Sequence, residues 1–120
     1  MIKKVTIYSY SMCGTCRKAL KWLNDNKIEY ELLDITKEVP SKELILSAIE
    51  QLGDRKYLFN TSGKSYRSLG SNVVKAMTKD ESLKALCNDG KLIKRPFLVD
   101  SNKHILIGFN ELKWSDHFLR

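Results

Sequence analysis

The sequence predicts an α/β fold in which a strand–helix–strand unit and a strand–strand–helix unit flank a mostly helical segment over about 41–90. Apolar runs of strand length occur near both ends of the chain, amphipathic helix patterns follow them, and helix-capping signals dominate the middle. The chain has 120 residues, of which 42% are hydrophobic and 29% charged, so we expect one globular domain spanning residues 1–120.

The first unit begins with a predicted buried strand over residues 2–8. A helix over 14–26 follows, and a second strand is predicted over 30–35. The helix has an apolar face formed by Ala19, Leu20 and Leu23. Because two strands joined through a helix pair side by side in this way, we expect them to be parallel with a right-handed crossover.

The middle of the chain carries paired start and stop signals for helices. Ser41 is placed as the N-cap of a helix that ends at Gly53. Residues 60–65 are rich in turn-forming side chains and predict a loop. A second helix follows, and its start has the capping-box pattern of Thr78 and Glu81.

The last unit begins with a predicted strand over 97–100, a tight turn at 101–102 and an antiparallel strand over 104–107. Asn110 is placed to cap a final helix over 111–119. The complete order is that of a thioredoxin-like core with a helical insertion between the second and third strands.

Cys13-Gly14-Thr15-Cys16 lies between the first strand and the first helix. A cysteine at the start of a helix faces unpaired backbone N–H groups and the positive end of the helix dipole, which both favour the thiolate. A thiolate is the nucleophile of disulfide exchange, and Cys16 lies close enough in sequence to close a disulfide with Cys13. A strand, a C-x-x-C turn and a helix together predict a thioredoxin-like redox site.

Other uses of the cysteines are less favoured by the sequence. A zinc site needs two more ligands, and the two histidines of the chain, His104 and His117, are thirteen residues apart, so we expect no metal site. Three cysteines without a signal-peptide pattern suggest a reducing cytoplasm instead of structural disulfides. Cys87 is expected to be a small packed residue or an inert thiol, with a resolving role left open.

The charge of the chain is +7, from 21 basic and 14 acidic side chains. Acidic residues are interleaved with the lysines, and no aromatic–basic binding motif occurs, so we expect a solvated basic surface and no direct nucleic-acid binding. The charge could still attract an anionic substrate or an acidic partner. No stretch approaches the roughly 18 continuous apolar residues of a membrane span, so we expect no membrane association.

Four segments in this order carry a resemblance to a known family: Cys13-Gly14-Thr15-Cys16-Arg17-Lys18, Phe59-Asn60-Thr61-Ser62-Gly63-Lys64-Ser65-Tyr66-Arg67, Leu92-Ile93-Lys94-Arg95-Pro96 and Gly108-Phe109-Asn110-Glu111. On them the chain resembles the arsenate reductase/Spx family over nearly its full length. Its central and C-terminal motifs look most like Gram-positive-type arsenate-reductase-like proteins.

The resemblance implies roles for three residues. Cys13 matches the nucleophilic cysteine, Arg95 matches an arginine that contacts an oxyanion beside the thiol, and Pro96 matches a cis-proline that opens the third strand. These roles suit the chemistry, because a thiolate that attacks an anionic substrate needs fixed positive charge, and arginine offers planar, multidentate donors. A trans proline at the start of an edge strand is the alternative for Pro96.

The chain also departs from the family pattern. Glutaredoxin-coupled arsenate reductases surround arsenate with three arginines, and only Arg95 has a plain counterpart here. Asn60 and Gly108 fall at the other two positions. Those reductases typically carry one active-site cysteine, whereas this chain has Cys16 as well. Other arginines of the chain could take the place of the two that lack a counterpart, and the candidates are Arg17, Arg55 and Arg67.

Two functions therefore remain open. The first is a thiol-dependent oxidoreductase resembling arsenate reductase, in which Cys13 attacks an oxyanion or a disulfide and Cys16 resolves the adduct. It needs no bound cofactor and takes electrons from thioredoxin or from glutaredoxin with glutathione. The alternative is an Spx-like regulator that binds RNA polymerase under control of a Cys13–Cys16 disulfide. Substrate contacts are expected from Gly14, Thr15, Asn60, Arg95 and Pro96.

Overall fold

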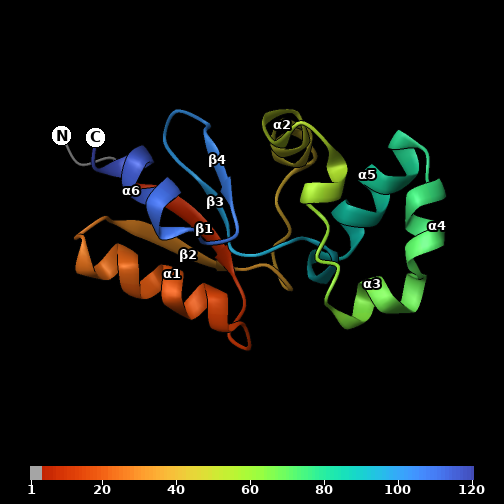
Figure 1. The fold of residues 1–120 in the computed structure, drawn as a ribbon, viewed down its shortest axis with the longest axis horizontal. Helices are drawn as coiled ribbons and strands as arrows, with labels where there is room; N and C mark the ends of the chain where they lie inside the picture. The colour runs from red at the N-terminus through yellow and green to blue at the C-terminus, as the bar shows by residue number, and fades with distance from the viewer. Residues whose placement is uncertain (1–3) are drawn as a thin grey trace. The chain divides into compact units, whose positions relative to one another are not determined.

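The computed structural model describes residues 4–120, and these divide into two units (Figure 1). The first unit consists of the described residues up to Leu33 together with Arg95–Arg120, and the second is Asp34–Lys94. The expectation that the whole chain forms a single domain stays a prediction. No helix of the described residues is long and apolar enough to cross a membrane.

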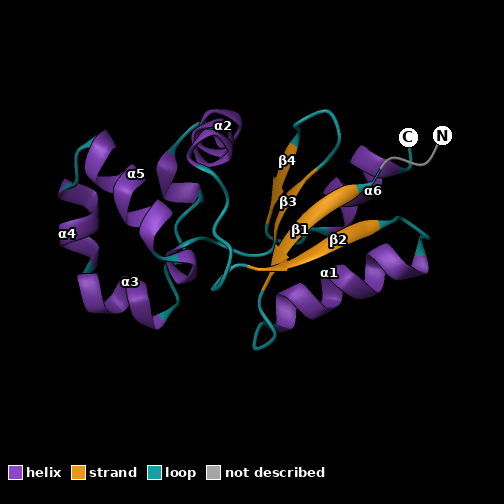
Figure 2. Ribbon diagram, turned by 180° about the vertical axis from the view of Figure 1, so that it is seen from behind, coloured by secondary structure: helices purple, strands orange, loops and turns teal. Residues whose placement is uncertain are grey.

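The first unit contains a four-stranded sheet (Figure 2). Its strands are β1 (Val5–Ser9), β2 (Tyr30–Asp34), β3 (Phe97–Val99) and β4 (Ile105–Ile107), in the order β2-β1-β3-β4. β3 is antiparallel to both β1 and β4. The N–H of Val5 donates to the carbonyl of Glu29, so β1 and β2 begin at the same edge and run parallel. The predicted α/β, thioredoxin-like arrangement is confirmed; residues 2–3 of the predicted first strand lie outside the described residues.

Helices α1 (Gly14–Asp25) and α6 (Glu111–Phe118) pack with the sheet around one apolar core. α1 contributes a stripe at helical spacing, and α6 contributes Trp114. The rings of Trp22 and Trp114 meet edge to face with their centroids 5.8 Å apart. Burial of each large side chain contributes about 1.5–3 kcal/mol, so this cluster holds α1 firmly on the sheet. The buried members are Val5, Ile7, Ala19, Trp22, Leu23, Leu98 and Trp114.

The second unit is built from helices α2 (Lys42–Leu52), α3 (Lys64–Leu69), α4 (Ser71–Ala76) and α5 (Lys79–Asn88), with short 3₁₀ turns η1 (Arg55–Tyr57) and η2 (Gly90–Leu92). The predicted caps are present. The Ser41 side chain accepts from the N–H of Leu44, and Gly53 ends α2 with a φ of 89°. Thr78 and Glu81 form the predicted capping box.

The predicted loop over 60–65 is too long, because α3 already begins at Lys64. Gly63 provides no side-chain cap for this helix, and Gly70, with a φ of 91°, separates α3 from α4. Neither boundary has the polar cap that made α2 and α5 recognisable.

An isolated bridge between Phe59 and Ile93 closes the second unit. On either side of it, the N–H of Asn60 donates to the carbonyl of Leu92 and the N–H of Lys94 to that of Leu58, each over 2.7 Å. The loop before α3 is therefore anchored to the segment that leads into β3.

Candidate active site

Cys13 is placed by a turn at the end of β1. Its N–H donates to the carbonyl of Tyr10 over 3.1 Å, and its extended backbone makes it the N-cap of α1. The Cys13 sulfur accepts the N–H of Cys16 over 3.2 Å. This N–H is one of the helix donors that lack an intrahelical partner, and such a bond stabilises negative charge on the sulfur. The predicted placement of Cys13 at the start of a helix is thus observed.

Cys16 has a different environment one turn into the helix. It is fully buried, whereas Cys13 is partly exposed, and both are free thiols. Burial, together with a side-chain hydrogen bond with Cys13, raises the pKa of Cys16 to about 11, against smaller lowering contributions from Ser9 and Tyr10. An incoming group can therefore reach Cys13, while Cys16 is held protonated behind it.

Arg95 and Pro96 come directly before β3, next to the cysteine loop. The Arg95–Pro96 peptide bond is cis, as the resemblance implies, and Pro96 is fully buried. Because Tyr8 pairs with Phe97 in the sheet, Pro96 enters β3 beside the end of β1, from which the cysteine loop departs. The Arg95 guanidinium lies over the Tyr10 ring, 5.0 Å from its centroid. A cation is thus held against the loop that carries Cys13.

Gly108 lies beside Pro96 at the end of β4. Its N–H donates to the Pro96 carbonyl over 2.9 Å, and its φ is 72°. Position 108, which the resemblance aligned with an arginine of the glutaredoxin-coupled reductases, therefore adjoins the opening of β3, and here it carries no side chain.

Arg17 is the one of the three substitute arginines that belongs to the cysteine loop. It is exposed on the first turn of α1, and its Nη1 donates back to the carbonyl of Ser11 over 2.9 Å. It is separated from Cys13 along the chain by the exposed Gly14 and Thr15 and the buried Cys16. Arg17 thereby adds a second guanidinium to the loop, which sequence spacing had left undecided.

Arg55 and Arg67 bond within the second unit. Arg55 donates to the carbonyl of Met77 over 2.7 Å and to the Ser82 hydroxyl over 2.9 Å, and so ties η1 to the start of α5. Arg67 donates to the carbonyl of Ser62 over 2.8 Å. Both guanidinium groups support the local fold of that unit.

Asn60 also belongs to the second unit. Its side-chain oxygen accepts from the Ser62 hydroxyl over 3.1 Å, and its amide nitrogen donates to the carbonyl of Lys91 over 3.4 Å. Its expected contact with substrate stays a prediction. Cys87 is half-buried on α5, where it lines a hollow of ≈ 510 Å³ with Pro40 and Leu83, and its expected role as an inert thiol stays a prediction.

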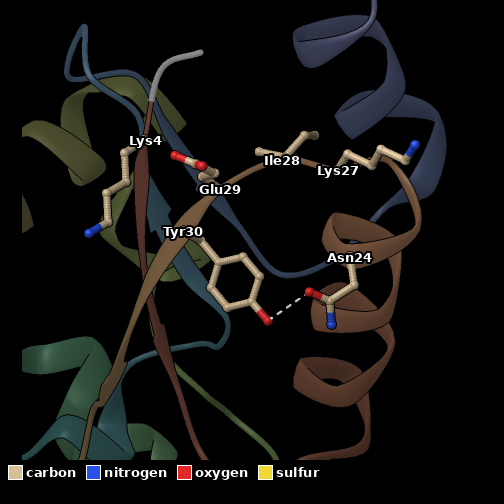
Figure 3. Close-up of a pocket in the computed structure, with 6 residues that line it drawn as sticks. All are labelled: Lys4, Asn24, Lys27, Ile28, Glu29 and Tyr30. Carbon is tan, nitrogen blue, oxygen red and sulfur yellow. Dashed lines mark hydrogen bonds between the residues drawn. The ribbon is translucent and has the colours of Figure 1, made fainter.

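A hollow of ≈ 740 Å³ lies elsewhere in the first unit, where α1 ends and β2 begins (Figure 3). The Tyr30 hydroxyl donates to the Asn24 side-chain oxygen across it over 3.1 Å. Its lining contains no thiol, so it is not part of the cysteine site. The lining residues are Lys4, Asn24, Lys27, Ile28, Glu29 and Tyr30.

Sequence reasoning missed one cluster. Asp100, His104 and His117 bring a ligand atom each within 4.8 Å of one another. The available signal was that Asp100 and His104 bracket a predicted tight turn, which brings residues four apart close together. Nothing in the sequence placed His117 beside that turn.

Residues 8–117 match the sequence profile of the ArsC family. The chain belongs to the ArsC family. Its relatives include YusI of Bacillus subtilis, an uncharacterised protein that is 41% identical over 95% of this chain and 98% of its own length. The regulatory protein MgsR of the same organism is 35% identical over 92% of this chain and 86% of its own. The global transcriptional regulator Spx of B. subtilis is 28% identical over 89% and 81%.

A solved structure shows the same fold for another ArsC-like protein. The crystal structure of a possible arsenate reductase from Streptococcus mutans has a TM-score of 0.85 and 40% identity. The match covers 95% of this chain and 98% of that one. This ArsC-family chain therefore shares its whole fold with reductase-like proteins, and its sequence with both reductase-like and regulatory relatives.

Proposed function

We propose that this ArsC-family protein is a thiol-dependent oxidoreductase that acts on an oxyanion of the arsenate type or on a disulfide. The observation that carries the proposal is the asymmetry of the two cysteines. Cys13 is accessible and accepts a helix N-terminal N–H, whereas Cys16 is buried directly behind it. An exposed attacking thiol and a shielded resolving thiol are what a two-step thiol reduction requires.

With arsenate, the Cys13 thiolate attacks arsenic, an arsenic–oxygen bond breaks, and the oxygen leaves as water after protonation. Cys16 then loses its proton and attacks the Cys13 sulfur. The sulfur–arsenic bond breaks, and its electron pair stays on arsenic, which becomes arsenite. The two cysteines become a disulfide, and two electrons have passed to arsenic.

Arg95 is proposed to hold the anionic substrate during this attack, with Pro96 and the exposed Gly14 and Thr15 forming the wall of the site. No bound cofactor takes part. The disulfide is returned to two thiols by thioredoxin or by glutaredoxin with glutathione, which supply the electrons in the reducing cytoplasm where we place the protein.

The first test is arsenate-dependent NADPH consumption with thioredoxin and glutaredoxin/glutathione systems supplied separately. We expect Cys13→Ser to abolish turnover and Arg95→Ala to weaken it by raising KM for the anion. Cys16→Ser should stall after one adduct unless glutathione resolves it. Cys87→Ser is the matched control, because it removes a thiol from the second unit, and it should keep wild-type turnover.

Absence of arsenate turnover, together with a Cys13–Cys16 disulfide that still forms, would remove arsenate as substrate. A protein disulfide would then be tested in the same coupled assay. Turnover of it that depends on Cys13 would keep the oxidoreductase proposal.

The relatives named as regulators favour a second candidate function. In it, the Cys13–Cys16 pair is a switch that controls binding to RNA polymerase. The test is capture of purified RNA polymerase by reduced and oxidised protein, with Cys13→Ser as a variant that cannot switch. Equal capture in both states, or none in either, contradicts this alternative.

A further inference from the structure

We propose that Asp100, His104 and His117 form a binding site for a transition-metal dication of the zinc class, separate from the thiol site. The three residues come from three places in the first unit: the end of β3, the residue before β4, and the last turn of α6. Their ligand atoms lie within 4.8 Å of one another.

The two distances from Asp100 to the histidine nitrogens suit one small cation. Asp100 Oδ2 lies 3.4 Å from His104 Nδ1 and 2.8 Å from His117 Nε2. In a tetrahedral zinc site with bonds of about 2.0–2.1 Å, neighbouring ligand atoms are about 3.3 Å apart. The first distance already has this value, and the second needs to lengthen by about half an ångström when the metal replaces a hydrogen bond.

The carboxylate is already oriented for such a role. Asp100 Oδ1 accepts the backbone N–H groups of Asn102 and His104 over 2.8 and 2.9 Å, and this fixes the side chain in the β3–β4 turn. The second oxygen, Oδ2, is thereby aimed at the two imidazoles. Outer hydrogen bonds that orient a ligating carboxylate in this way are a regular part of metal sites.

The three side chains of the cluster differ in how far they are exposed to solvent. The side chains of Asp100, His117 and His104 are 12%, 25% and 63% exposed, so a cation can enter past His104 and meet two more shielded ligands. The centroids of the His104 and His117 rings are 5.5 Å apart, and a nitrogen of each ring lies within 3.4 Å of Asp100 Oδ2. Three protein ligands leave a fourth position for water.

The set of two imidazoles and one carboxylate determines which class of metal ion the site would prefer. Imidazole binds Zn²⁺, Cu²⁺ and Ni²⁺ well, whereas Mg²⁺ and Ca²⁺ prefer sets made of oxygens. Binding needs the lone pair of His117 Nε2, so a proton on that nitrogen moves to Nδ1 or to solvent. No oxidation or reduction is involved.

The site is independent of the cysteines. Pro96 and Asp100 lie at opposite ends of β3, four residues apart along an extended strand, which corresponds to about 13 Å. The inference therefore does not depend on the proposed oxidoreductase function.

The chain has two histidines, so imidazole nitrogen NMR reports on this site directly. We would titrate metal-free full-length protein with Zn²⁺, and repeat the titration with Cys13→Ser/Cys16→Ser, which removes zinc binding by the thiol pair. In both proteins we expect His104 Nδ1 and His117 Nε2 to take metal-bound shifts, and in the double variant these shifts should saturate at one equivalent. Mg²⁺ should leave both signals unchanged.

Variants test whether zinc binds specifically to these three residues or to any exposed carboxylate. His104→Gln and Asp100→Asn should each weaken Zn²⁺ binding at least about tenfold. His104 is exposed, so the first variant should leave the fold intact, as circular dichroism would show. The matched control is Asp116→Asn, which removes an exposed carboxylate of α6 that pairs with Arg120 and should bind as wild type. Imidazole signals that do not move at saturating zinc, or equal weakening by Asp116→Asn, would overturn the proposal.

Discussion

At the scale of single residues, the two cysteines of one loop are made unlike by their positions on α1. Cys13 caps the helix and is reached by solvent, while Cys16 faces the core side of the same turn. Only two residues of sequence thus separate an accessible sulfur from a buried one. The redox proposal depends on this difference more than on the presence of two cysteines.

The raised pKa of Cys16 has a consequence for stability. The pKa of this thiol is 9.0 for an unperturbed cysteine, as in the unfolded chain, and about 11 in the fold, so the unfolded chain loses this proton first as pH rises. The free energy of unfolding should therefore decrease as the pH rises from 9.0 to about 11. The decrease is at most about 1.4 kcal/mol per pH unit.

Denaturant unfolding of reduced wild type and Cys16→Ala at several alkaline pH values measures this effect, because lysines and tyrosines titrate alike in both proteins. The difference in stability between the two should change with pH only above about pH 9. A difference that is constant through this range would contradict the assignment of a raised pKa to Cys16.

At the scale of elements, the helices that could be located from the sequence are those whose start is capped by a polar side chain. α2, α5 and α6 begin with Ser41, Thr78 and Asn110, whose side chains accept helix N–H groups, and the sequence located all three. α3 and α4 begin at glycines without a side-chain cap, and the sequence did not locate them. Their boundaries depend on backbone conformations that glycine can adopt, and the presence of a glycine in the sequence does not by itself predict a helix start.

A substitution at Gly90 would test how closely the segments of the second unit pack. A Cβ at this position would collide with the backbone carbonyl of Ile35, which cannot rotate away. We expect Gly90→Ala to lower the free energy of unfolding by about 1–3 kcal/mol, as overpacked cores do. The measurement is denaturant unfolding followed by circular dichroism.

Gly63→Ala is the matched control for Gly90→Ala. Its added methyl group would meet the Asn60 side-chain nitrogen at 2.6 Å, and that flexible group can turn aside. Its effect should be clearly smaller. Equal loss of stability in both variants would show that the contact with Ile35 is not the cause.

At the scale of the whole molecule, the chain leaves the sheet after β2 and returns to it at β3, with the second unit between. Both tryptophans, Trp22 and Trp114, lie in the core of the first unit. Tryptophan fluorescence therefore reports on that unit, whereas far-ultraviolet circular dichroism reports on the helices of both.

If the chain is one domain, as its sequence predicts, the two signals should follow a single unfolding transition. Val74→Ala provides the sharper test, because Val74 is buried in the second unit. We expect this variant to shift the fluorescence midpoint as much as the circular dichroism midpoint. A shift confined to circular dichroism would mean that the two units unfold separately.

Sequence reasoning reached the positions of the strands along the chain and the position of Cys13, because both follow from local patterns. The cis Arg95–Pro96 bond came from family resemblance alone, since a proline in sequence does not show its isomer. The approach of His117 to Asp100 depends on how α6 packs across the sheet, which no local pattern records. Interactions that join distant elements were the ones that required the structure.

The shortness of β3 has a consequence for how the chain tolerates insertions. Only Phe97, Leu98 and Val99 pair with both neighbouring strands. A slip of one residue would turn Leu98 out of the core and would displace Pro96 and Asp100 together. Changes of chain length within this strand would thus damage the thiol end and the histidine end in one event, and relatives that vary in length should place the variation outside it.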